Sequence, residues 1–378
     1  MHDEQEVGSD EQSPWMRRAL ELAQDALYRT SPNPRVGCVL VNAAGQIIGE
    51  GATQQVGGPH AEVMALRDAA RRGHSVQGAT AYVTLEPCAH TGRTGPCCEA
   101  LARAGVARVV ASLQDPNPQV AGHGLAHLRA AGVQVDVGLG AAQSRELNLG
   151  FMSRMVRKQP WVRMKVAASL DGKTALGNGV SQWITSSDAR SDGHAWRARS
   201  CAILTGVGTV LADNPRLDVR DVLTERQPKL VIVDSHLRTP ADAAIFKAPR
   251  AVLIYALNIN QPQADELRAQ GALLIEAPRD GQGRIDLAFV MQDLAKAQEI
   301  NELHVEAGET LNGALLNASL VDELLAYVAP KLLGPGKEWA LLPSLQRLDQ
   351  SIDMEFHAID RVGVDLRVLA RIKGRDQF

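Results

Sequence analysis

The chain has 378 residues, and because this exceeds what one hydrophobic core usually organises, two domains of ordinary size are expected. Hydrophobic residues make up 45% of it and charged residues 22%, as in typical globular proteins, and no apolar run approaches the roughly 20 residues of a membrane span. The 40 Lys and Arg nearly balance the 43 Asp and Glu, and only 4% of residues are aromatic. This composition argues against nucleic acid and membrane as partners and favours a small-molecule substrate.

The first residues of the given sequence and its cysteine content predict a cytoplasmic protein without disulfides. Residues 1–13 are polar and acid-rich and lack the features of a signal or transit peptide, which predicts a disordered tail on a cytoplasmic protein. The five cysteines are an odd number, so no disulfide framework is expected. Cys88, Cys97 and Cys98 cluster, which indicates metal binding or catalysis, whereas Cys38 and Cys201 lie in apolar runs typical of a core.

The first half alternates helices with strands. Apolar residues at helical spacing predict a helix over 15–28, followed by strands over 36–41 and 47–49. A helix opening at Gly57-Gly58-Pro59 and ending at Gly73 would carry His60 in its first turn. Strands are then predicted over 79–85, 106–113 and 133–137, and helices over 97–104 and 125–131. This alternation predicts a layered α/β domain.

Four residues in this half have the chemistry of a zinc deaminase site. His60, Cys88 and Cys97 would reach one point from two helix starts and a strand end, leaving a fourth tetrahedral position for water. A zinc ion lowers the pKa of such a water to roughly 7. Glu62, two residues past His60 and not needed as a ligand, could move protons. Cys98 would point about 100° away from Cys97 on a helix and is expected to be a bystander.

The second half reads as a separate α/β domain, with a predicted boundary that gives 14–157 and 158–378 as the two domains. Strands are predicted over 161–168, 201–205, 230–234, 251–255, 273–275 and 304–306 of one sheet, with a helix over 187–199. The absence of a G-x-G-x-x-G motif argues against a Rossmann fold. A glycine-bearing turn over 308–313, before a helix, could instead present amides to a diphosphate.

Together these motifs resemble the family of bifunctional riboflavin biosynthesis proteins. In the first half the matching segments are 31–37, 59–62, the long-spaced Pro87-Cys88 to Pro96-Cys97 segment, and Asp115-Pro116-Asn117-Pro118. In the second half they are Lys165 with 169–172, then 181–185, 209–215 and 306–308. The eight residues between Cys88 and Cys97 depart from the general P-C-x-x-C signature but match this family. The resemblance implies a zinc-dependent, cytidine-deaminase-like domain followed by a dihydrofolate-reductase-like domain.

The resemblance also implies roles for individual residues of the first half. The zinc ligands would be His60, Cys88 and Cys97, and Glu62 would be the catalytic proton carrier. The deaminase substrate would be contacted by Asn33, His90, Arg93, Asp115 and Asn117. Simple turn formation by Asn33, Asp115 and Asn117, and a solvated loop position for Arg93, remain alternatives.

In the second half, the resemblance implies an NADPH site and a second substrate site. The cofactor would be held by Ala167, Trp183, Thr209, Asp213, Ser235, Gly308, Glu309, Thr310, Leu311, Asn312 and Gly313. The substrate would be held by Ser181, Arg197, Leu217, Arg220 and Glu306, with Lys165 and Glu306 also catalytic. Ala307 stands where the family more usually has glycine. A solvent-facing Lys165 and a helix-surface Arg197 are the alternatives from sequence alone.

The function implied is a pair of consecutive reactions. Zn²⁺-dependent hydrolysis would remove an amine from a diamino-pyrimidinone that carries a phosphoribosylamino group, and NADPH would then reduce the ribosyl group to ribityl. One alternative is a deaminase of a free nucleoside or nucleic-acid base fused to an unrelated reductase, and another is a zinc-organised binding module. The oligomeric state, including a homo-oligomer, is left open.

Overall fold

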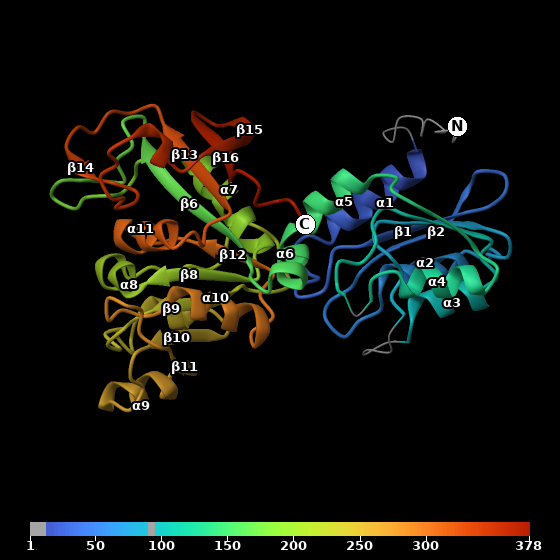
Figure 1. The fold of residues 1–378 in the computed structure, drawn as a ribbon, viewed down its shortest axis with the longest axis horizontal. Helices are drawn as coiled ribbons and strands as arrows, with labels where there is room; N and C mark the ends of the chain where they lie inside the picture. Colours follow the sequence, from blue (N-terminus) through green and yellow to red (C-terminus); the bar gives the residue numbers. More distant parts are fainter. Residues whose placement is uncertain (1–12, 90–94, 119) are drawn as a thin grey trace. The chain divides into compact units, whose positions relative to one another are not determined.

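The computed structural model describes residues 13–89, 95–118 and 120–378. The chain divides into two compact units, residues 1–157 and residues 158–378 (Figure 1). Among the described residues, the structure contains no helix with the length and apolar character needed to cross a membrane.

The first unit is built on a five-stranded sheet with strand order β2-β1-β3-β4-β5. Its strands are β1 (Gly37–Val41), β2 (Ile47–Ala52), β3 (Thr80–Val83), β4 (Arg108–Ala111) and β5 (Gln134–Val137). Its helices are α1 (Pro14–Asp25), α2 (Ala61–Arg71), α3 (Cys97–Arg103), α4 (His123–Ala130), α5 (Ala141–Leu147) and α6 (Leu149–Arg157). β3, β4 and β5 run parallel, so their carboxyl ends share one edge of the sheet.

Glycines in β1 and β2 set how closely helices approach the two faces of this sheet. A Cβ at Gly37 would lie 1.9 Å from the carbonyl oxygen of Ala19 in α1, and one at Gly49 would lie 2.4 Å from that of Ala65 in α2. Helices α1 and α2 therefore cover opposite faces (Figure 1). The apolar side chains of α1 pack on Val39, Val41 and Tyr82.

The predicted elements of this unit are present, with two corrections. His60 is the N-cap residue of α2 and not part of its first turn. The segment 141–157, for which no helix was predicted, forms α5 and α6, and Leu149, Phe151 and Met152 of α6 are buried.

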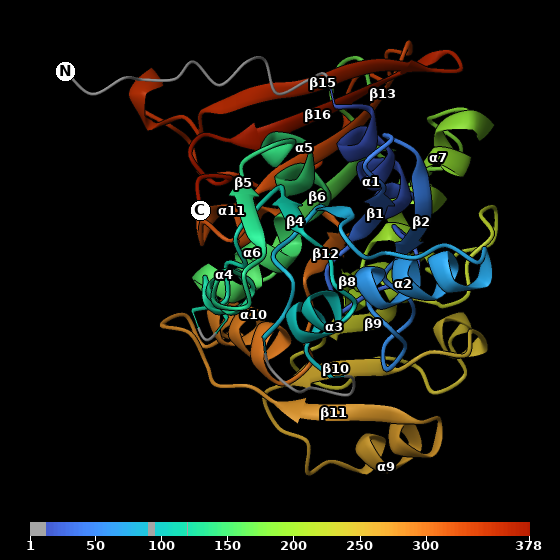
Figure 2. The ribbon, with the colours of Figure 1, turned by 90° about the vertical axis from the view of Figure 1, so that its right-hand side faces the viewer.

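The second unit is built on a nine-stranded sheet with strand order β11-β10-β9-β8-β12-β6-β13-β16-β15, in which β11 and β15 form opposite edges (Figure 2). Its predicted strands are β6 (Trp161–Ser169), β8 (Ala202–Gly206), β9 (Lys229–Val233), β10 (Val252–Ala256), β11 (Ala272–Glu276) and β12 (Glu302–Val305). The strands that were not predicted are β13 (Glu323–Ala329), β15 (Met354–Val362) and β16 (Asp365–Ile372), with β7 (Ala175–Leu176) and β14 (Gly336–Lys337) as a small separate pair. The strands from β11 to β13 in this order are parallel, and β16 pairs antiparallel with both β13 and β15.

The helices of this unit are α7 (Ser187–Arg199), α8 (Val207–Asp213), α9 (Pro262–Ala269), α10 (Leu287–Lys296) and α11 (Glu309–Asn317), with short 3₁₀ helices at Ala244–Lys247 and Leu348–Gln350. Helix α7 has the predicted limits. The predicted turn over 308–313 is wrong, because Gly308 is the N-cap of α11 and the next five residues are helical. The run after β8 is likewise helical from Val207, as α8.

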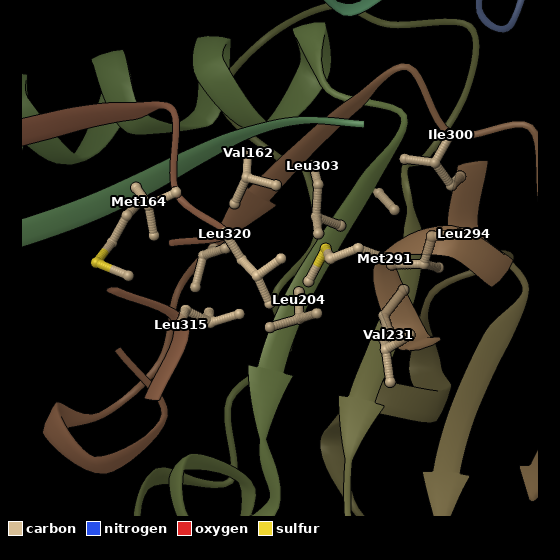
Figure 3. Close-up of a cluster of buried hydrophobic side chains, with 14 of the residues drawn as sticks. Val162, Met164, Leu204, Val231, Met291, Leu294, Ile300, Leu303, Leu315 and Leu320 are labelled. Carbon is tan, nitrogen blue, oxygen red and sulfur yellow. The ribbon is translucent and has the colours of Figure 1, made fainter. Parts of the chain in front are cut away.

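The two faces of this sheet differ in chemistry. On one face, Val162 and Met164 of β6 and Leu303 of β12 pack against Met291 of α10 and Leu315 of α11 (Figure 3). On the other face, the alternate residue of β6, Arg163, is buried and donates to Glu302 at 3.0 Å and to Glu323. Arg199 of α7 and Arg371 of β16 donate to the same two carboxylates. Side chains of α7 therefore meet a layer of paired charges there.

Candidate functional site

Three potential metal ligands converge in the first unit. The ligand atoms of His60, Cys88 and Cys97 all lie within 4.8 Å of one another. The Nδ1 of His60 is 3.5 Å from the sulfur of Cys88 and 3.4 Å from that of Cys97. A tetrahedral zinc ion with Zn–N of about 2.0 Å and Zn–S of about 2.3 Å holds nitrogen and sulfur about 3.5 Å apart. The donor set and its spacing therefore fit zinc.

Each ligand is delivered by a different element. His60 caps α2 with an extended backbone, and Cys97 is the first residue of α3. Cys88 follows β3, and its carbonyl oxygen accepts a hydrogen bond from the backbone N–H of Cys98 at 3.2 Å. Cys98 itself is buried and is not among the three converging ligands, as expected for a bystander.

The charges at this cluster favour a cation. The Cys97 thiol donates a hydrogen bond to Cys88, which lowers the pKa of Cys88 and raises the pKa of Cys97. The two sulfurs thus share one proton, which a dication would displace. Glu62 is the second residue of α2, two residues after His60, and is 3% exposed. Burial raises the pKa of its carboxyl group to about 7. Such a carboxyl group can both take up and release a proton near neutral pH.

The loop that carries Asn33 is fixed by a residue that sequence reasoning missed. The side-chain oxygen of Asn148 accepts from the backbone N–H of Arg35 at 2.8 Å, and its amide donates to the Arg35 carbonyl at 2.9 Å. After this loop, the Val36 carbonyl accepts from Thr53, and the next residue, Gln54, donates to the Pro59 carbonyl. These hydrogen bonds connect the end of the loop that carries Asn33, through residues 53 and 54, to Pro59, the residue before His60.

A second missed residue, Glu86, lies between β3 and Cys88. Its carboxylate is 3% exposed and accepts from the backbone N–H of Asp115 at 3.0 Å. Asp115 in turn accepts from the N–H of Asn117 at 2.8 Å, so the predicted turn chemistry is present at these two residues. His90 and Arg93 lie outside the described residues.

The second unit brings three of its predicted residues together at the carboxyl end of the parallel strands. Glu306 directly follows β12, and Arg197 of α7 donates to both of its carboxylate oxygens, with Nη2 to Oε2 at 2.8 Å. The Nζ of Lys165 in β6 is 4.0 Å from the same Oε2. Neither Arg197 nor Lys165 is a free surface residue, since their side chains are 16% and 23% exposed.

The pairing sets the ionisation of these groups. Burial alone would raise the pKa of Glu306, but Arg197 against it holds that pKa well below its usual range. Burial lowers the pKa of Lys165, and the charge of Glu306 opposes that shift. Glu306 is therefore held as an anion by Arg197, while burial beside Arg197 makes Lys165 more readily deprotonated than an exposed lysine.

The other predicted substrate residues of this unit are less tightly clustered. Arg197 also donates to the Asp218 carbonyl at 3.0 Å, which brings the segment with Leu217 and Arg220 against α7. The Leu217 side chain is buried, and the guanidinium of Arg220 pairs with Asp218. Ser181 lies before α7, in the segment between β7 and that helix, and is partly buried.

Two helix starts lie side by side where a cofactor was predicted. Gly206 caps α8 and Gly308 caps α11, and these helices follow the neighbouring parallel strands β8 and β12. A Cβ at Gly308 would lie 4.0 Å from Oγ1 of Thr209, and one at Gly206 would lie 3.3 Å from the Leu311 side chain. Free N–H groups of two helices thus face one region, which suits an anionic group.

Six of the remaining predicted cofactor residues are exposed or partly buried. Asp213 ends α8 and is exposed, Ser235 follows β9, and Ala167 lies on β6 two residues beyond Lys165. Trp183 is 63% exposed and stacks on Arg190. Glu309 and Thr310 are the first residues of α11.

Asn312 and Gly313 of α11 face the protein itself. The Asn312 side chain is buried and donates to the Ala307 carbonyl at 3.1 Å and the Trp339 carbonyl at 2.8 Å. A Cβ at Gly313 would lie 2.1 Å from the Leu341 carbonyl oxygen. Asn312 therefore holds the Ala307–Gly308 turn by a hydrogen bond, whereas Gly313 allows the close approach of the segment at Leu341.

Comparison with known proteins agrees with both units. Residues 9–113 match the family described as the cytidine and deoxycytidylate deaminase zinc-binding region, and residues 160–368 match the RibD C-terminal domain. The riboflavin biosynthesis protein RibD of Escherichia coli K12 is 47% identical over 361 residues, covering 93% of this chain and 97% of that protein.

Solved structures give the same result. Acinetobacter baumannii RibD (form 1) has 42% identity and a TM-score of 0.86, covering 94% of this chain and 97% of that chain. A Thermotoga maritima structure, described as a diaminohydroxyphosphoribosylaminopyrimidine deaminase/5-amino-6-(5-phosphoribosylamino)uracil reductase, has 31% identity and a TM-score of 0.82, covering 95% and 97%. The predicted order of deaminase and reductase domains is confirmed, and a fusion to an unrelated reductase is excluded. The chain belongs to the RibD family of bifunctional riboflavin biosynthesis enzymes, which combine a zinc-binding deaminase region with a reductase domain.

Proposed function

We propose that this chain carries out the two reactions named for the Thermotoga maritima relative, on the same phosphoribosyl pyrimidine. The observation that carries the proposal is the convergence of His60, Cys88 and Cys97 beside the buried carboxyl of Glu62. That arrangement has the ligands and the proton carrier of a hydrolytic deaminase, and it is joined to a reductase domain.

In the deaminase reaction, His60, Cys88 and Cys97 would hold zinc. When bound, zinc lowers the pKa of a coordinated water and so supplies a nucleophile at neutral pH. Glu62 takes the proton of the attacking water and delivers it to the departing amine, so that the carbon gains oxygen and ammonia leaves. Asn33 would hold the pyrimidine ring, and Asp115 and Asn117 would contact the ribose phosphate together with His90 and Arg93.

In the reductase reaction, the ribose ring opens to an imine that accepts a hydride at C1. NADPH supplies that hydride when bound. Lys165, whose pKa is lowered by burial, gives a proton to the imine nitrogen as the hydride reaches C1, so that the C=N bond becomes a C–N single bond. Glu306 stays ionised beside Arg197 and accepts hydrogen bonds from sugar hydroxyls, while Arg197 and Arg220 orient the substrate phosphate.

The cofactor would lie along the carboxyl edge of the parallel sheet. The N–H groups at the starts of α8 and α11, with Thr209 and Thr310, would hold its diphosphate. Ala167, Ser235 and Asp213 would line the rest of the site, and Trp183 offers an exposed ring for stacking. Asn312 and Gly313 would act by holding the turn before α11.

We further propose that the enzyme works in the cytoplasm on a free small molecule. The near balance of 40 basic and 43 acidic residues supports a phosphorylated metabolite over a nucleic acid.

The proposal is tested with the zinc-loaded chain, NADPH and the phosphoribosyl diamino-pyrimidine, following ammonia and NADPH absorbance together. We expect ammonia release first and NADPH oxidation after it, with cytidine inert in both signals. Ammonia release from cytidine but not from the phosphoribosyl pyrimidine would contradict the proposal and favour a nucleoside deaminase.

A further inference from the structure

The carboxylate of Glu86 accepts four hydrogen bonds, and none of the roles proposed above involves this residue. One carboxylate oxygen, Oε2, accepts from the backbone N–H groups of Asp115 at 3.0 Å and Gly122 at 2.9 Å. The other, Oε1, accepts from Gly124 at 2.8 Å and Leu125 at 3.2 Å. Four backbone donors thus occupy the four acceptor positions of one buried carboxylate.

These donors come from two segments that are distant in sequence from Glu86. Asp115 begins the turn that also contains Asn117, and Gly122 is the N-cap of α4. Gly124 and Leu125 belong to the first turn of α4, whose free N–H groups favour an anion. Glu86 therefore joins the turn with two proposed substrate contacts to a helix start.

The same residue lies on the segment that delivers a metal ligand. A Cβ at Gly124 would lie 1.9 Å from the carbonyl oxygen of Pro87, so α4 is pressed directly against the residue between Glu86 and Cys88. Beyond it, the Cys88 carbonyl is bonded by Cys98, and the Cys88 sulfur accepts from the N–H of Cys97 at 3.5 Å. An unbroken chain of contacts links α4, Glu86, Cys88 and the start of α3.

We propose that Glu86 is a positioning residue of the deaminase site. It holds the metal ligand Cys88 at a fixed distance from the turn that contains Asp115 and Asn117. It acts through backbone amides and does not touch substrate. Outer partners of metal ligands typically change metal affinity or activity by 10- to 100-fold. This inference rests on the proposed deaminase function of the same site.

Glu86→Gln is the sharpest test because glutamine keeps the shape but has a single acceptor oxygen. Its NH₂ group would face two backbone N–H groups. Because all of these groups are donors, two hydrogen bonds are lost and the donors are left unpaired. We expect zinc affinity to fall about 10-fold or more. With saturating zinc, we expect KM for the phosphoribosyl pyrimidine to stay raised, because the Asp115 turn remains displaced. NADPH oxidation with the deaminated intermediate should be unchanged.

Glu99→Gln is the matched control, since Glu99 lies two residues from Cys97 but its side chain is 43% exposed and pairs at the surface with Arg103. If Glu86→Gln and Glu99→Gln share wild-type zinc affinity and deaminase KM, the proposal is overturned. A purely structural role would lower thermal stability while leaving KM at saturating zinc unchanged, and that result also overturns it.

Gly124→Ala provides an independent variant if Glu86→Gln does not fold. Its Cβ would lie 1.9 Å from the Pro87 carbonyl oxygen and 3.2 Å from Oε1 of Glu86, so α4 would have to move away from both while Glu86 keeps its two carboxylate oxygens. We expect the same combination of weaker zinc binding and raised KM, and wild-type values would contradict the proposal. If the wild-type enzyme releases no ammonia, the proposed function fails, and the zinc affinities still test the role of Glu86.

Discussion

The two sites differ in how their charges are balanced. The first unit brings together two thiols and a carboxyl group, which repel one another when ionised and need a cation to hold them. In the second unit, Arg197 and Lys165 already surround Glu306, so protein side chains complete the site. We therefore expect the first site to depend on a metal and the second to keep its geometry without one, so that a substitution can disable either site separately.

The largest expected effect comes from removing a thiol of the metal cluster. Cys97→Ala leaves two ligands, so zinc content should fall toward zero, and ammonia release should fall on the order of 10³-fold as several kcal/mol of metal assistance are lost. Metal analysis and the ammonia assay measure both. Cys98→Ala is the control, because Cys98 is buried beside Cys97 but does not join the cluster. Equal zinc loss in both variants would contradict the ligand assignment.

Removing the proton carrier should have a smaller effect and leave zinc in place. Glu62→Gln cannot take up the proton of water, so ammonia release should fall on the order of 10²-fold or more. NADPH oxidation with the deaminated intermediate should keep its wild-type rate. Unchanged ammonia release in a variant with full zinc content would exclude the role assigned to Glu62 and favour a zinc-organised binding module.

Breaking the ion pair of the second unit should damage stability as well as reduction. Arg197→Met leaves the buried Glu306 without its bidentate partner, which should cost about 3–5 kcal/mol in the free energy of unfolding. Denaturant unfolding measures this loss, and zinc content should not change. Arg347→Met is the control, since the pair of Arg347 with Asp349 is exposed and should contribute less than about 1 kcal/mol. Similar losses in both variants would contradict the account.

The buried charge layer under α7 should make the second unit sensitive to acid. Burial would raise the pKa of Glu323, but the charge of Arg163 lowers it below the value in the unfolded chain. Glu323 therefore contributes its full stabilisation above the unfolded pKa of about 4.3 and loses it as the pH falls below that value. Burial lowers the pKa of His304, so the unfolded chain gains a proton below about pH 6.5 that the folded chain does not take up. Stability should therefore decline from about pH 6.5 and steeply below about 4.3.

Tryptophan fluorescence reports mainly on this unit, because four of the five tryptophans lie after residue 158. Melting temperatures that stay constant from neutral pH into this acid range would contradict the contribution of these groups.

The smallest expected effect is a packing change near the cofactor region. Gly313→Ala would bring a Cβ to 2.1 Å from the Leu341 carbonyl, and the shift needed should cost about 1–3 kcal/mol and weaken NADPH binding. Gly193→Ala in α7 meets nothing within 4 Å and should be neutral or stabilising by up to about 1 kcal/mol. If Gly193→Ala lowered the free energy of unfolding and Gly313→Ala left it unchanged, the packing assigned to these two glycines would be wrong.

Sequence was sufficient for elements and groups whose signal is local. His60 and Glu62 lie in one motif, and the start of α7 is marked by Ser186, whose side chain accepts from the backbone N–H of Ala189. β15 was missed because its side chains are largely exposed, without the alternation that marks a half-buried strand. α5 and α6 were not predicted, although the predicted boundary after residue 157 coincides with the end of α6.

Long-range partners lay beyond sequence reasoning. Glu86 bonds to amides 29 to 39 residues further along, and a backbone amide carries no sequence signal. Arg197 and Glu306 are 109 residues apart, and their pairing depends on α7 covering the charged face of the sheet. The one local clue to Glu86 was an acidic residue directly after a buried strand, where a carboxylate is costly unless it is hydrogen-bonded.

The central claim is that two independent sites, one dependent on metal and one not, share this chain. The most direct measurement removes zinc with a chelator and then follows ammonia from the phosphoribosyl diamino-pyrimidine and, separately, NADPH oxidation with the deaminated intermediate. The account predicts that ammonia release stops and returns with added zinc, while NADPH oxidation continues at the untreated rate. Loss of both signals together, or ammonia release that survives chelation, would contradict it.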